Sequence, residues 1–325
     1  MSKLKLAIPK GSLEKATYEI FHGAFYRITG QERTYRPKIN DSDIEVKILR
    51  PQEIPVYIAG GVHDVGVTGA DWILETGAKV ENLLDLEYGR VRVISAIQKN
   101  VKADSLSSFF EERWKGGETV RISTEYLNIA SKYLMALPAY ARRFGRLEPK
   151  VVTPWWTKGK NPKAVIYLSF GATEAKPPED ADAIIDVTET GSSLEQNSLK
   201  VVDEIMVSSA RLVTNTQALG DPWKREKIID LMAGLKGVVE ARKKVHIFLN
   251  VRERDLEKLL ESLPALKKPT ISPLSEKGWF AVNTVVAKSE MLGLLPTLRR
   301  VAQGLVVHAP EQVLPLEEIN EKGSG

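Results

Sequence analysis

A cluster of hydroxyl side chains follows an apolar run in the segment AIIDVTETGSSLE, residues 183–195. The apolar residues predict a strand that reaches Asp186, and the residues after Gly191 predict a helix. The hydroxyl residues around the glycine are Thr188, Thr190, Ser192 and Ser193. Backbone N–H groups in such a loop favour an anion, and glycine lets a ligand come close. An acid at the strand end could accept hydrogen bonds from ribose hydroxyls, so the segment is typical of a sugar-phosphate site.

The same residues also fit an ordinary capped turn. Ser192 or Thr190 would then be the N-cap of the following helix, and Glu195 would complete a capping box if Ser192 is the cap. The local sequence leaves both interpretations open.

Other loops repeat this strand–glycine–helix design. Lys10 follows an apolar run in IPKGSLEKA, and Glu174 lies in a GATEA stretch. The segment LRPQEIPVYIAGGVHDVGVTGADWI contributes Arg50, Thr68, Gly69 and Asp71. A single loop of this kind is common at protein surfaces. Lys10 could also be an ordinary surface lysine beside a capped helix, without a role in binding. Several such loops in one chain suit a substrate with several phosphates, or two such substrates.

An acid and an aromatic ring begin a further predicted helix in STEYLNIA. Glu125 there suits the positive end of the helix dipole, which is the structural explanation. The functional alternative is that Glu125 and Tyr126 face a nucleotide base. The four histidines are scattered without metal-ligand spacing. A GxSxG elbow, a Walker loop and a GxGxxG fingerprint are absent from the sequence, which argues against a hydrolase, a kinase or an NAD enzyme.

Composition indicates a globular protein that acts on small anionic ligands. The 325 residues carry a net charge of +4 without a concentrated basic stripe, so a nucleic-acid partner is not expected. Cysteine is absent, which excludes disulfides and suits a reducing compartment. A membrane association is not expected, because the sequence has no apolar run near the roughly 20 residues that span a bilayer. The N-terminal residues lack a signal-peptide pattern, so we expect a cytoplasmic protein.

Strand and helix patterns alternate along most of the chain, which predicts an α/β fold with a mainly parallel sheet. The expected strands are 4–8, 44–49, 90–98, 119–124, 148–154, 163–168 and one or two within 200–215, with a strand, turn and helix at 64–75. The expected helices are 13–25, 50–61 beginning at Pro51, 105–114, 125–145 with a break at Pro138, and 221–244. From residue 245 to 310 the pattern changes to βαββαβ, the order of a ferredoxin-like unit.

Five stretches resemble the ATP phosphoribosyltransferase family in its long form. They are KLAIPKGSLEKA, LRPQEIPVYIAGGVHDVGVTGADWI, RISTEYLNIASKYL, LSFGATEAKPPEDADAIIDVTETGSSLEQNSL and KKPTISPLSEKGWFAV. They are spread over about 300 residues in the family's order. The segment DVTETGSSLE resembles the family's phosphoribosyl-diphosphate loop.

The resemblance implies a catalytic core of two lobes, similar to periplasmic binding proteins, and a C-terminal ferredoxin-like (ACT-like) domain that binds histidine. On this basis we expect lobe I at 1–95 with 195–220, lobe II at 96–194, a linking helix at 221–243 and a regulatory domain at 244–325. The family also implies homo-oligomers, as dimers and hexamers.

The implied reaction joins N1 of the adenine of ATP to C1 of phosphoribosyl diphosphate, with Mg²⁺, and releases diphosphate. It is the first step of histidine biosynthesis and is inhibited by histidine. Implied catalytic residues are Asp186, Glu174 and Lys10. Implied phosphoribosyl-diphosphate ligands are Asp186, Thr188, Glu189, Thr190, Gly191, Ser192 and Ser193. Implied ATP ligands are Arg50, Thr68, Gly69, Asp71, Glu125 and Tyr126, and implied histidine ligands are Thr270 and Ser272. The resemblance assigns neither metal ligands nor the base that takes a proton from the adenine amino group.

Two departures from the family pattern carry their own hypotheses. Ser12 stands where many members carry an arginine, so a phosphate contact is lost or supplied by another residue such as Lys10. The segment TPWWTKGKNPK, residues 153–163, differs from the usual family sequence. We expect Trp155 or Trp156 to close over the cleft or to contact another subunit. A ligand-binding module without turnover on the same scaffold is the alternative function.

Overall fold

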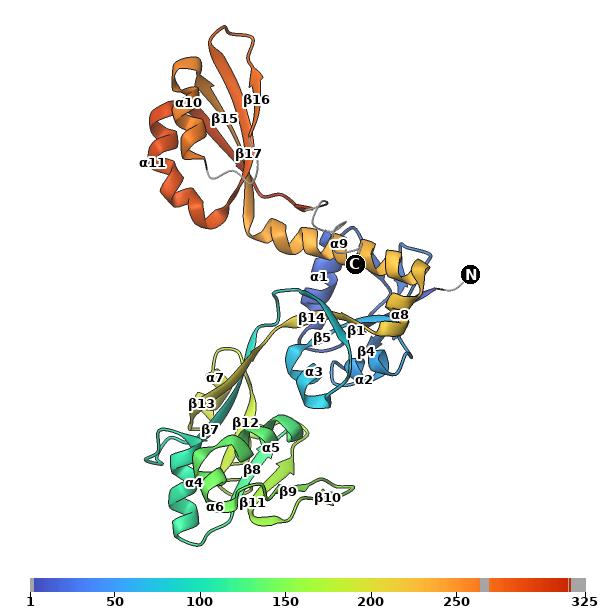
Figure 1. The fold of residues 1–325 in the computed structure, drawn as a ribbon, viewed down its shortest axis with the longest axis vertical. Coiled ribbons are helices and arrows are strands. Elements are labelled where there is room, and N and C mark those ends of the chain that lie inside the picture. The colour runs from blue at the N-terminus through green and yellow to red at the C-terminus, as the bar shows by residue number, and fades with distance from the viewer. Residues whose placement is uncertain (1–2, 264–268, 315, 317–325) are drawn as a thin grey trace. The chain divides into compact units, whose positions relative to one another are not determined.

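A computed structural model describes residues 3–263, 269–314 and 316. Its fold is mixed α/β, and the described residues form sheets of five, seven, four and two strands (Figure 1). The chain forms two compact units: residues 1–4, 15–46 and 218–325 in one, and residues 5–14 and 47–217 in the other. Among the described residues, no helix combines the length and apolar character needed to cross a membrane.

The five-stranded sheet has the order β4-β1-β5-β14-β6. Its strands are β1 (Leu4–Pro9), β4 (Ile44–Leu49), β5 (Val65–Gly69), β6 (Glu81–Asp85) and β14 (Ala210–Thr214). Strands β1 and β5 are parallel, whereas β14 runs antiparallel to both β5 and β6. Strands β5 and β6 therefore run in the same direction as β1, in line with the prediction of a mainly parallel sheet, and β14, which returns from a distant part of the sequence, is the antiparallel exception.

Short helices flank this sheet. They are α2 (Ile54–Ala59) and α3 (Ala70–Thr76). Helix α2 begins three residues later than the predicted start at Pro51, and Pro55 occupies its first turn. Proline fits there because the first N–H groups of a helix have no partner within the helix. Ile54 and Ile58 of α2 pack on Ala7 and Val213 of the sheet.

The seven-stranded sheet has the order β10-β9-β11-β8-β12-β7-β13. Its strands are β7 (Val91–Gln98), β8 (Val120–Thr124), β9 (Pro149–Val152), β10 (Thr157–Lys158), β11 (Asn161–Leu168), β12 (Ala183–Thr188) and β13 (Leu199–Ser208). Four neighbours, β9, β11, β8 and β12, are parallel, while β7 is antiparallel to β12 and β13. The carboxyl ends of those four parallel strands therefore lie along one edge of the sheet.

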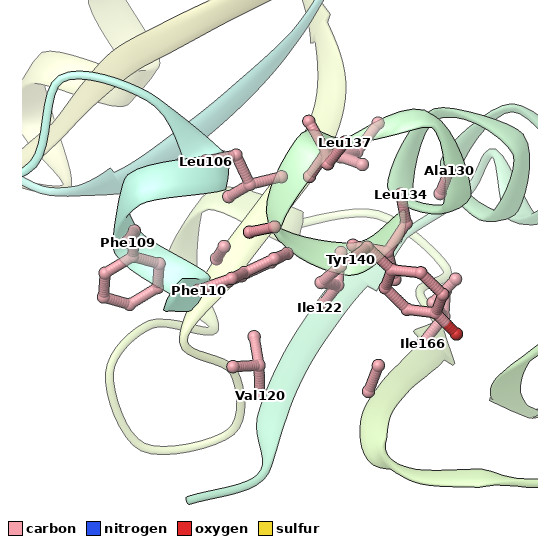
Figure 2. Packing of buried hydrophobic residues seen from close by; sticks show 14 of the residues in the cluster. Leu106, Phe109, Phe110, Val120, Ile122, Ala130, Leu134, Leu137, Tyr140 and Ile166 are labelled. Atoms are coloured by element: carbon pink, nitrogen blue, oxygen red, sulfur yellow. The ribbon is translucent and has the colours of Figure 1, made fainter. Parts of the chain in front are cut away.

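Helices α4 (Leu106–Lys115), α5 (Leu127–Ala136) and α6 (Pro138–Phe144) pack on one face of this sheet through a core rich in aromatic side chains. The other helical elements of this region are α7 (Ser192–Gln196) and the 3-10 turn η1 (Thr173–Ala175). Side chains of α4, α5 and α6 meet those of β8 and β11 in one core, as Figure 2 shows for Phe110, Ile122 and Leu134. Pro138 separates α5 from α6, as predicted, because it cannot continue a preceding helix.

The chain passes between the two sheets at residues 86–90 and at residue 209. Strand β6 ends at Asp85 and β7 starts at Val91, and Ser209 alone separates β13 from β14. Val91 lies four residues before the expected domain limit at 95, and Ser209 lies fourteen residues after the expected limit at 195. The domain division itself stays a prediction.

The other unit contains an N-terminal helix, a long helix and the C-terminal sheet. Its early elements are α1 (Glu14–Gly23), β2 (Ile28–Thr29) and β3 (Lys38–Ile39), and its later helices are α8 (Thr216–Gly220) and α9 (Pro222–Arg242). Asp221 caps α9 by accepting the N–H groups of Trp223 and Lys224 at 3.0 and 3.1 Å. Helix α9 confirms the helix predicted at 221–244.

The C-terminal elements follow the predicted βαββαβ order. They are β15 (Lys244–Arg252), α10 (Glu253–Ser262), β16 (Thr270–Pro273), β17 (Trp279–Ala287), the turn η2 (Lys288–Glu290), α11 (Met291–Val301) and β18 (Ala302–His308). The strands form an antiparallel sheet in the order β16-β17-β15-β18. Alternate β15 residues such as Ile247 and Val251 bury against Leu259 and Leu298 of the two helices. Pro296 lies inside α11 without ending it.

Candidate active site

The loop after β12 leaves most of its hydroxyls in solvent. Gly191 adopts the left-handed conformation, with φ of +84°, and its N–H donates to Thr188 Oγ1 at 2.9 Å. The exposed polar residues of the loop are Glu189, Thr190, Ser192 and Ser193. A Cβ atom at Gly191 would meet no other atom within 4 Å, so the space beside the glycine is open. This loop could therefore receive a ligand without rearranging packed side chains.

The capped-turn interpretation of this loop is wrong in its details. Gly191, not Ser192 or Thr190, precedes the first residue of α7, and no side chain caps that helix. The Thr190 and Ser192 hydroxyls instead form a hydrogen bond with each other, at 3.1 Å. The predicted capping box with Glu195 does not form, because Ser192 is already a helical residue.

Asp186 lies partly buried in β12 just before this loop. Burial raises the pKa of its carboxyl, the Val187 N–H at 2.7 Å and the Thr173 hydroxyl lower it, and the charge of Glu174 raises it further. The pKa of the Glu125 carboxyl is also raised, first by burial and then by the charge of Asp186. The structure thus brings together three acids that the sequence singled out from separate segments. A cluster of acids in which the pKa values of Asp186 and Glu125 are raised is typical of functional sites.

The loop after β11 joins this acidic group. The Thr173 hydroxyl lies 3.1 Å from Ser169 Oγ, which donates to the carbonyl of Gly171 at 3.0 Å. The Ser169 N–H donates to the carbonyl of Thr124 at the end of β8 at 2.8 Å. These bonds hold the Glu174 segment at the ends of the parallel strands, where ligands collect in α/β sheets.

Lys10 and Arg50 lie close together at the edge of the five-stranded sheet. The Lys10 N–H donates to the Leu49 carbonyl at 2.8 Å, next to Arg50. A Cβ at Gly11, which has φ of +95°, would lie 3.8 Å from the Arg50 guanidinium. The side chain of Arg50 is exposed, so this edge presents positive charge to solvent.

The loop after β5 is occupied by its own side chains. The Thr68 hydroxyl donates to the Pro51 carbonyl at 2.8 Å. The two carboxylate oxygens of Asp71 accept from Ser208 Oγ at 2.6 Å and from the Tyr126 hydroxyl at 2.8 Å. A Cβ at Gly69 would lie 2.1 Å from Asp71 Oδ1, so any other residue there would displace the Asp71 carboxylate from its hydrogen bonds to Ser208 and Tyr126.

Tyr126 is enclosed on more than one side. Its ring stacks on Trp72, with centroids 4.5 Å apart, and 3% of the residue is exposed. Burial raises the pKa of its hydroxyl, and the charge and hydrogen bond of Asp71 raise it further. The tyrosine is therefore a neutral donor that links α3 to the start of α5.

Glu75 is a buried acid that the sequence analysis missed. Its carboxylate accepts the N–H groups of Asn128 and Ile129 at 2.9 Å, and the Asn128 amide donates to the Glu75 carbonyl at 2.8 Å. Burial raises the pKa of this carboxyl, although the backbone donors partly offset the rise. Its spacing of four residues from Asp71, on one face of α3, was the available signal.

The predicted histidine ligands lie on an exposed edge strand. Thr270 faces Asn283, and Ser272 faces Ala281, across the β16–β17 pair. Both hydroxyl residues are exposed. They belong to the unit that contains the four-stranded sheet, and not to the residue range that contains Asp186.

Comparisons with known proteins agree along the chain. A family described as ATP phosphoribosyltransferase matches residues 50–237, and one described as HisG, C-terminal domain, matches residues 241–310. An ATP phosphoribosyltransferase of Chlorobaculum parvum is 39% identical over 308 residues, which are 93% of this chain and 94% of that protein. One from Pelotomaculum thermopropionicum is 36% identical over 319 residues, covering 96% of this chain and 100% of the relative. The solved ATP phosphoribosyl transferase (HisG:HisZ) complex from Thermotoga maritima is similar over 73% of this chain and 98% of its own, with 26% identity and a TM-score of 0.55.

Proposed function

This chain belongs to the ATP phosphoribosyltransferase family, pentosyltransferases of histidine biosynthesis, and we propose that it catalyses the family's reaction at the site around Asp186. The reaction forms a bond between N1 of the adenine of ATP and C1 of phosphoribosyl diphosphate, and diphosphate leaves. The observation that carries this proposal is the pairing of a half-buried carboxylate with an open, hydroxyl-rich loop at one strand end.

Asp186 and its loop would hold the phosphoribosyl group. The carboxylate of Asp186 accepts hydrogen bonds from the ribose hydroxyls, while amides and hydroxyls of residues 188–193 surround the 5′-phosphate. Positive charge develops on the ribose as diphosphate departs. The charge of Glu174 acts on Asp186, and the charge of Asp186 acts on Glu125, so these neighbouring acids favour that positive charge.

The five-stranded sheet would hold the phosphates of ATP. Arg50 and Lys10 are suited to its phosphates, because Arg50 is exposed beside Gly11 at the same edge. Thr68, Gly69, Asp71 and Tyr126 support that edge through the bonds described above. Alignment of N1 with C1 contributes roughly 7–11 kcal/mol to lowering the barrier of such a reaction. Glu174 and Glu125 are both candidates for the base that takes the proton from the adenine amino group.

The acids present fit a magnesium ion that arrives with the diphosphate. Mg²⁺ is usually held by one or two carboxylates together with substrate phosphates. Asp186 and Glu174 supply such carboxylates, whereas no group of three or more acids and histidines in the described part of the chain could hold a metal by itself. When bound, the ion would neutralise charge on the leaving diphosphate.

The test is diphosphate release when the protein is mixed with ATP, phosphoribosyl diphosphate and Mg²⁺. We expect release that requires both substrates, and a product with the adenine and the new ribose joined. A protein that binds both substrates but releases no diphosphate would instead be the non-catalytic ligand-binding module.

The fold supports the two-lobed and regulatory descriptions of the family. Two separate sheets carry the Lys10–Arg50 and Asp186 groups, as a bilobed core requires. The C-terminal sheet order β16-β17-β15-β18, with helices α10 and α11 packed on the sheet, supports the proposal of a ferredoxin-like (ACT-like) domain. Assembly into dimers and hexamers belongs to the same proposal.

Histidine would inhibit the enzyme by binding this C-terminal domain. Thr270 and Ser272 support the proposal, since they place exposed hydroxyls on an edge strand with prolines at 269 and 273. Inhibition at a separate site needs a coupling free energy of about 1–3 kcal/mol. The alternative is that the domain only joins subunits.

The test of this regulation is histidine titration of the full-length Thr270→Ala variant. We expect more histidine to be required for half inhibition, with uninhibited turnover and assembly by light scattering unchanged. Wild-type protein that assembles but ignores histidine would support the purely assembling role.

A further inference from the structure

Two large, exposed aromatic side chains contact each other beyond the carboxyl ends of strands β9 and β11 in the seven-stranded sheet. Trp155, in the turn between β9 and β10, is 71% exposed, and Phe170, in the loop after β11, is 70% exposed. Their ring centroids are 5.8 Å apart and their planes are nearly perpendicular, at 85°. Aromatic rings gain most from burial, so an exposed contacting pair indicates a surface that receives another flat or apolar group.

The pair lies on the same sheet edge as the phosphoribosyl loop. Strands β9, β11, β8 and β12 are parallel neighbours in that order, so the segments that follow them share one edge. Trp155 follows β9, Phe170 follows β11, Glu125 follows β8, and residues 188–193 follow β12. Neighbouring strands are about 4.8 Å apart, which places β9 about 14 Å from β12. That span is comparable with a phosphoribosyl group joined to a purine.

A chain of hydrogen-bonding groups connects Phe170 to the acid of the site. The N–H of Ser169, the residue before Phe170, donates a hydrogen bond to the carbonyl of Thr124 at 2.8 Å. Its hydroxyl lies 3.1 Å from that of Thr173, which also hydrogen-bonds to Asp186. The position of the phenyl ring is therefore coupled to the position of the carboxylate that would hold the ribose.

We propose that Trp155 and Phe170 bind the adenine ring of ATP, as a stacking corner that presents N1 to the ribose held at Asp186. Two perpendicular rings can hold a flat base with its face on one ring and its edge against the other. The proposal rests on the proposed function and names the residues that recognise the purine. Tyr126 is less suited to this stacking role, because its ring is already covered by Trp72 and 3% of the residue is exposed.

Trp156 provides a matched control within the same turn. Its ring lies 4.9 Å from the ammonium group of Lys158, and it lines a separate pocket of about 370 Å³ with Glu75 and Lys132. Trp155 and Trp156 are thus adjacent tryptophans with different neighbours. Trp156→Ser changes the same turn but leaves the contact between Trp155 and Phe170 in place, so it reports any effect of the turn alone.

The experiment compares Trp155→Ser, Phe170→Ser and Trp156→Ser with wild type in full kinetics. Loss of a base-stacking ring should raise KM for ATP about 10-fold in the first two variants. KM for phosphoribosyl diphosphate should stay within about two-fold, since it is not the stacked substrate. Trp155→Phe should restore most of the ATP affinity, because the ring is retained. Trp156→Ser should behave as wild type.

A binding measurement makes the test independent of turnover. ATP should quench tryptophan fluorescence of the wild type, and Trp155→Phe should lose that quenching while Trp156→Phe retains it. Quenching in a wild-type protein that releases no diphosphate would refute the proposed function and still support the purine site.

Three results would overturn the inference while leaving the proposed function intact. The first is an active Trp155→Ser protein with an unchanged KM for ATP. The second is an equal effect of Trp155→Ser and Trp156→Ser, which would indicate disruption of the turn. The third is a change of assembly state in Trp155→Ser by light scattering, which would make the pair a subunit contact.

Discussion

The loops after β5 and β12 have similar sequences, but the polar side chains are buried in the first loop and exposed in the second. Both place a threonine and a glycine between an apolar strand and a short helix, in VTGAD and in VTETGSS. After β5, the polar groups are buried and bonded to one another, from Thr68 to Pro51 and from Asp71 to Ser208. After β12, the hydroxyls of Thr190 and Ser192 are exposed. The first loop therefore stabilises the protein, and the second is available for a ligand.

The two glycines differ in the same way. A side chain at Gly69 would collide with Asp71 Oδ1, so this glycine is required by internal packing. Gly191 faces open space and is required by its left-handed conformation. A strand–glycine–helix pattern thus identifies a tight turn, but only the partners of its polar groups tell whether the turn binds anything.

The largest expected effect is on catalytic activity, and it comes from a substitution beside the open loop after β12. Asp186→Asn keeps the size of the side chain but removes the charged acceptor for ribose hydroxyls. We expect kcat/KM to fall at least about 100-fold, equivalent to about 2.7 kcal/mol. Circular dichroism and the urea midpoint should stay near those of the wild type. Full activity in a folded Asp186→Asn protein would remove the site from this loop.

Gly191→Val should have a similar effect through the backbone. The valine would force φ of +84° on a β-branched residue and place methyl groups beside the loop amides. We expect about a 100-fold lower kcat/KM. Gly30→Val is the matched control, because Gly30 has φ of +86° and equally open surroundings outside the site. Equal loss of activity in both variants would show that strain, and not the site, is responsible.

Substitutions around the loop after β5, whose polar groups bond to other protein groups, should change the stability of the protein. Tyr126→Phe removes the donor to Asp71 Oδ2 and leaves a buried carboxylate oxygen without that bond. We expect the free energy of unfolding, from urea titration, to fall by about 1–3 kcal/mol. If Tyr126→Phe instead lost activity at unchanged stability, the hydroxyl would belong to the ligand site and the comparison would fail.

The acids around Asp186 predict an unusual pH profile. The Asp186 carboxyl must be ionised to accept ribose hydroxyls, and burial raises its pKa above the usual 3.8. Protonation therefore begins at a higher pH, and kcat/KM should decline as the pH is lowered through that raised pKa. Glu174→Gln removes the neighbouring negative charge that raises this pKa and should move the decline to lower pH. A decline centred at 3.8 in the wild type would contradict the role of burial.

Local chemistry made several of these features predictable. Pro138 ends one helix and starts another, and the alternation of buried residues in β15 was visible in the sequence. Strand β6, with the sequence ENLLD, was missed because its residues do not alternate and its pairing depends on β14. Strand propensity of such a segment depends on its neighbours more than on its own residues.

The arrangement of the site was less predictable than its members. Asp186, Glu174 and Glu125 were selected from separate motifs, and the structure brings them together. The pairing of Asp71 with Tyr126 and Ser208 joins residues 55 and 137 positions apart. No local pattern encodes such contacts, so a threonine–glycine loop that is internally satisfied could not be told from one that is open.

The smallest effect gives the most direct test, because it uses the same substitution in both loops. Thr68→Val removes a buried donor to the Pro51 carbonyl and should lower the free energy of unfolding by about 1 kcal/mol, without changing KM. Thr190→Val removes an exposed hydroxyl, so stability should stay within about 0.5 kcal/mol. It should raise KM for phosphoribosyl diphosphate about five-fold, the equivalent of one hydrogen bond of about 1 kcal/mol. Urea titration and steady-state kinetics on the two variants measure both quantities. If Thr190→Val destabilises the protein and leaves KM unchanged, the loop after β12 is structural as well, and the contrast between the loops disappears.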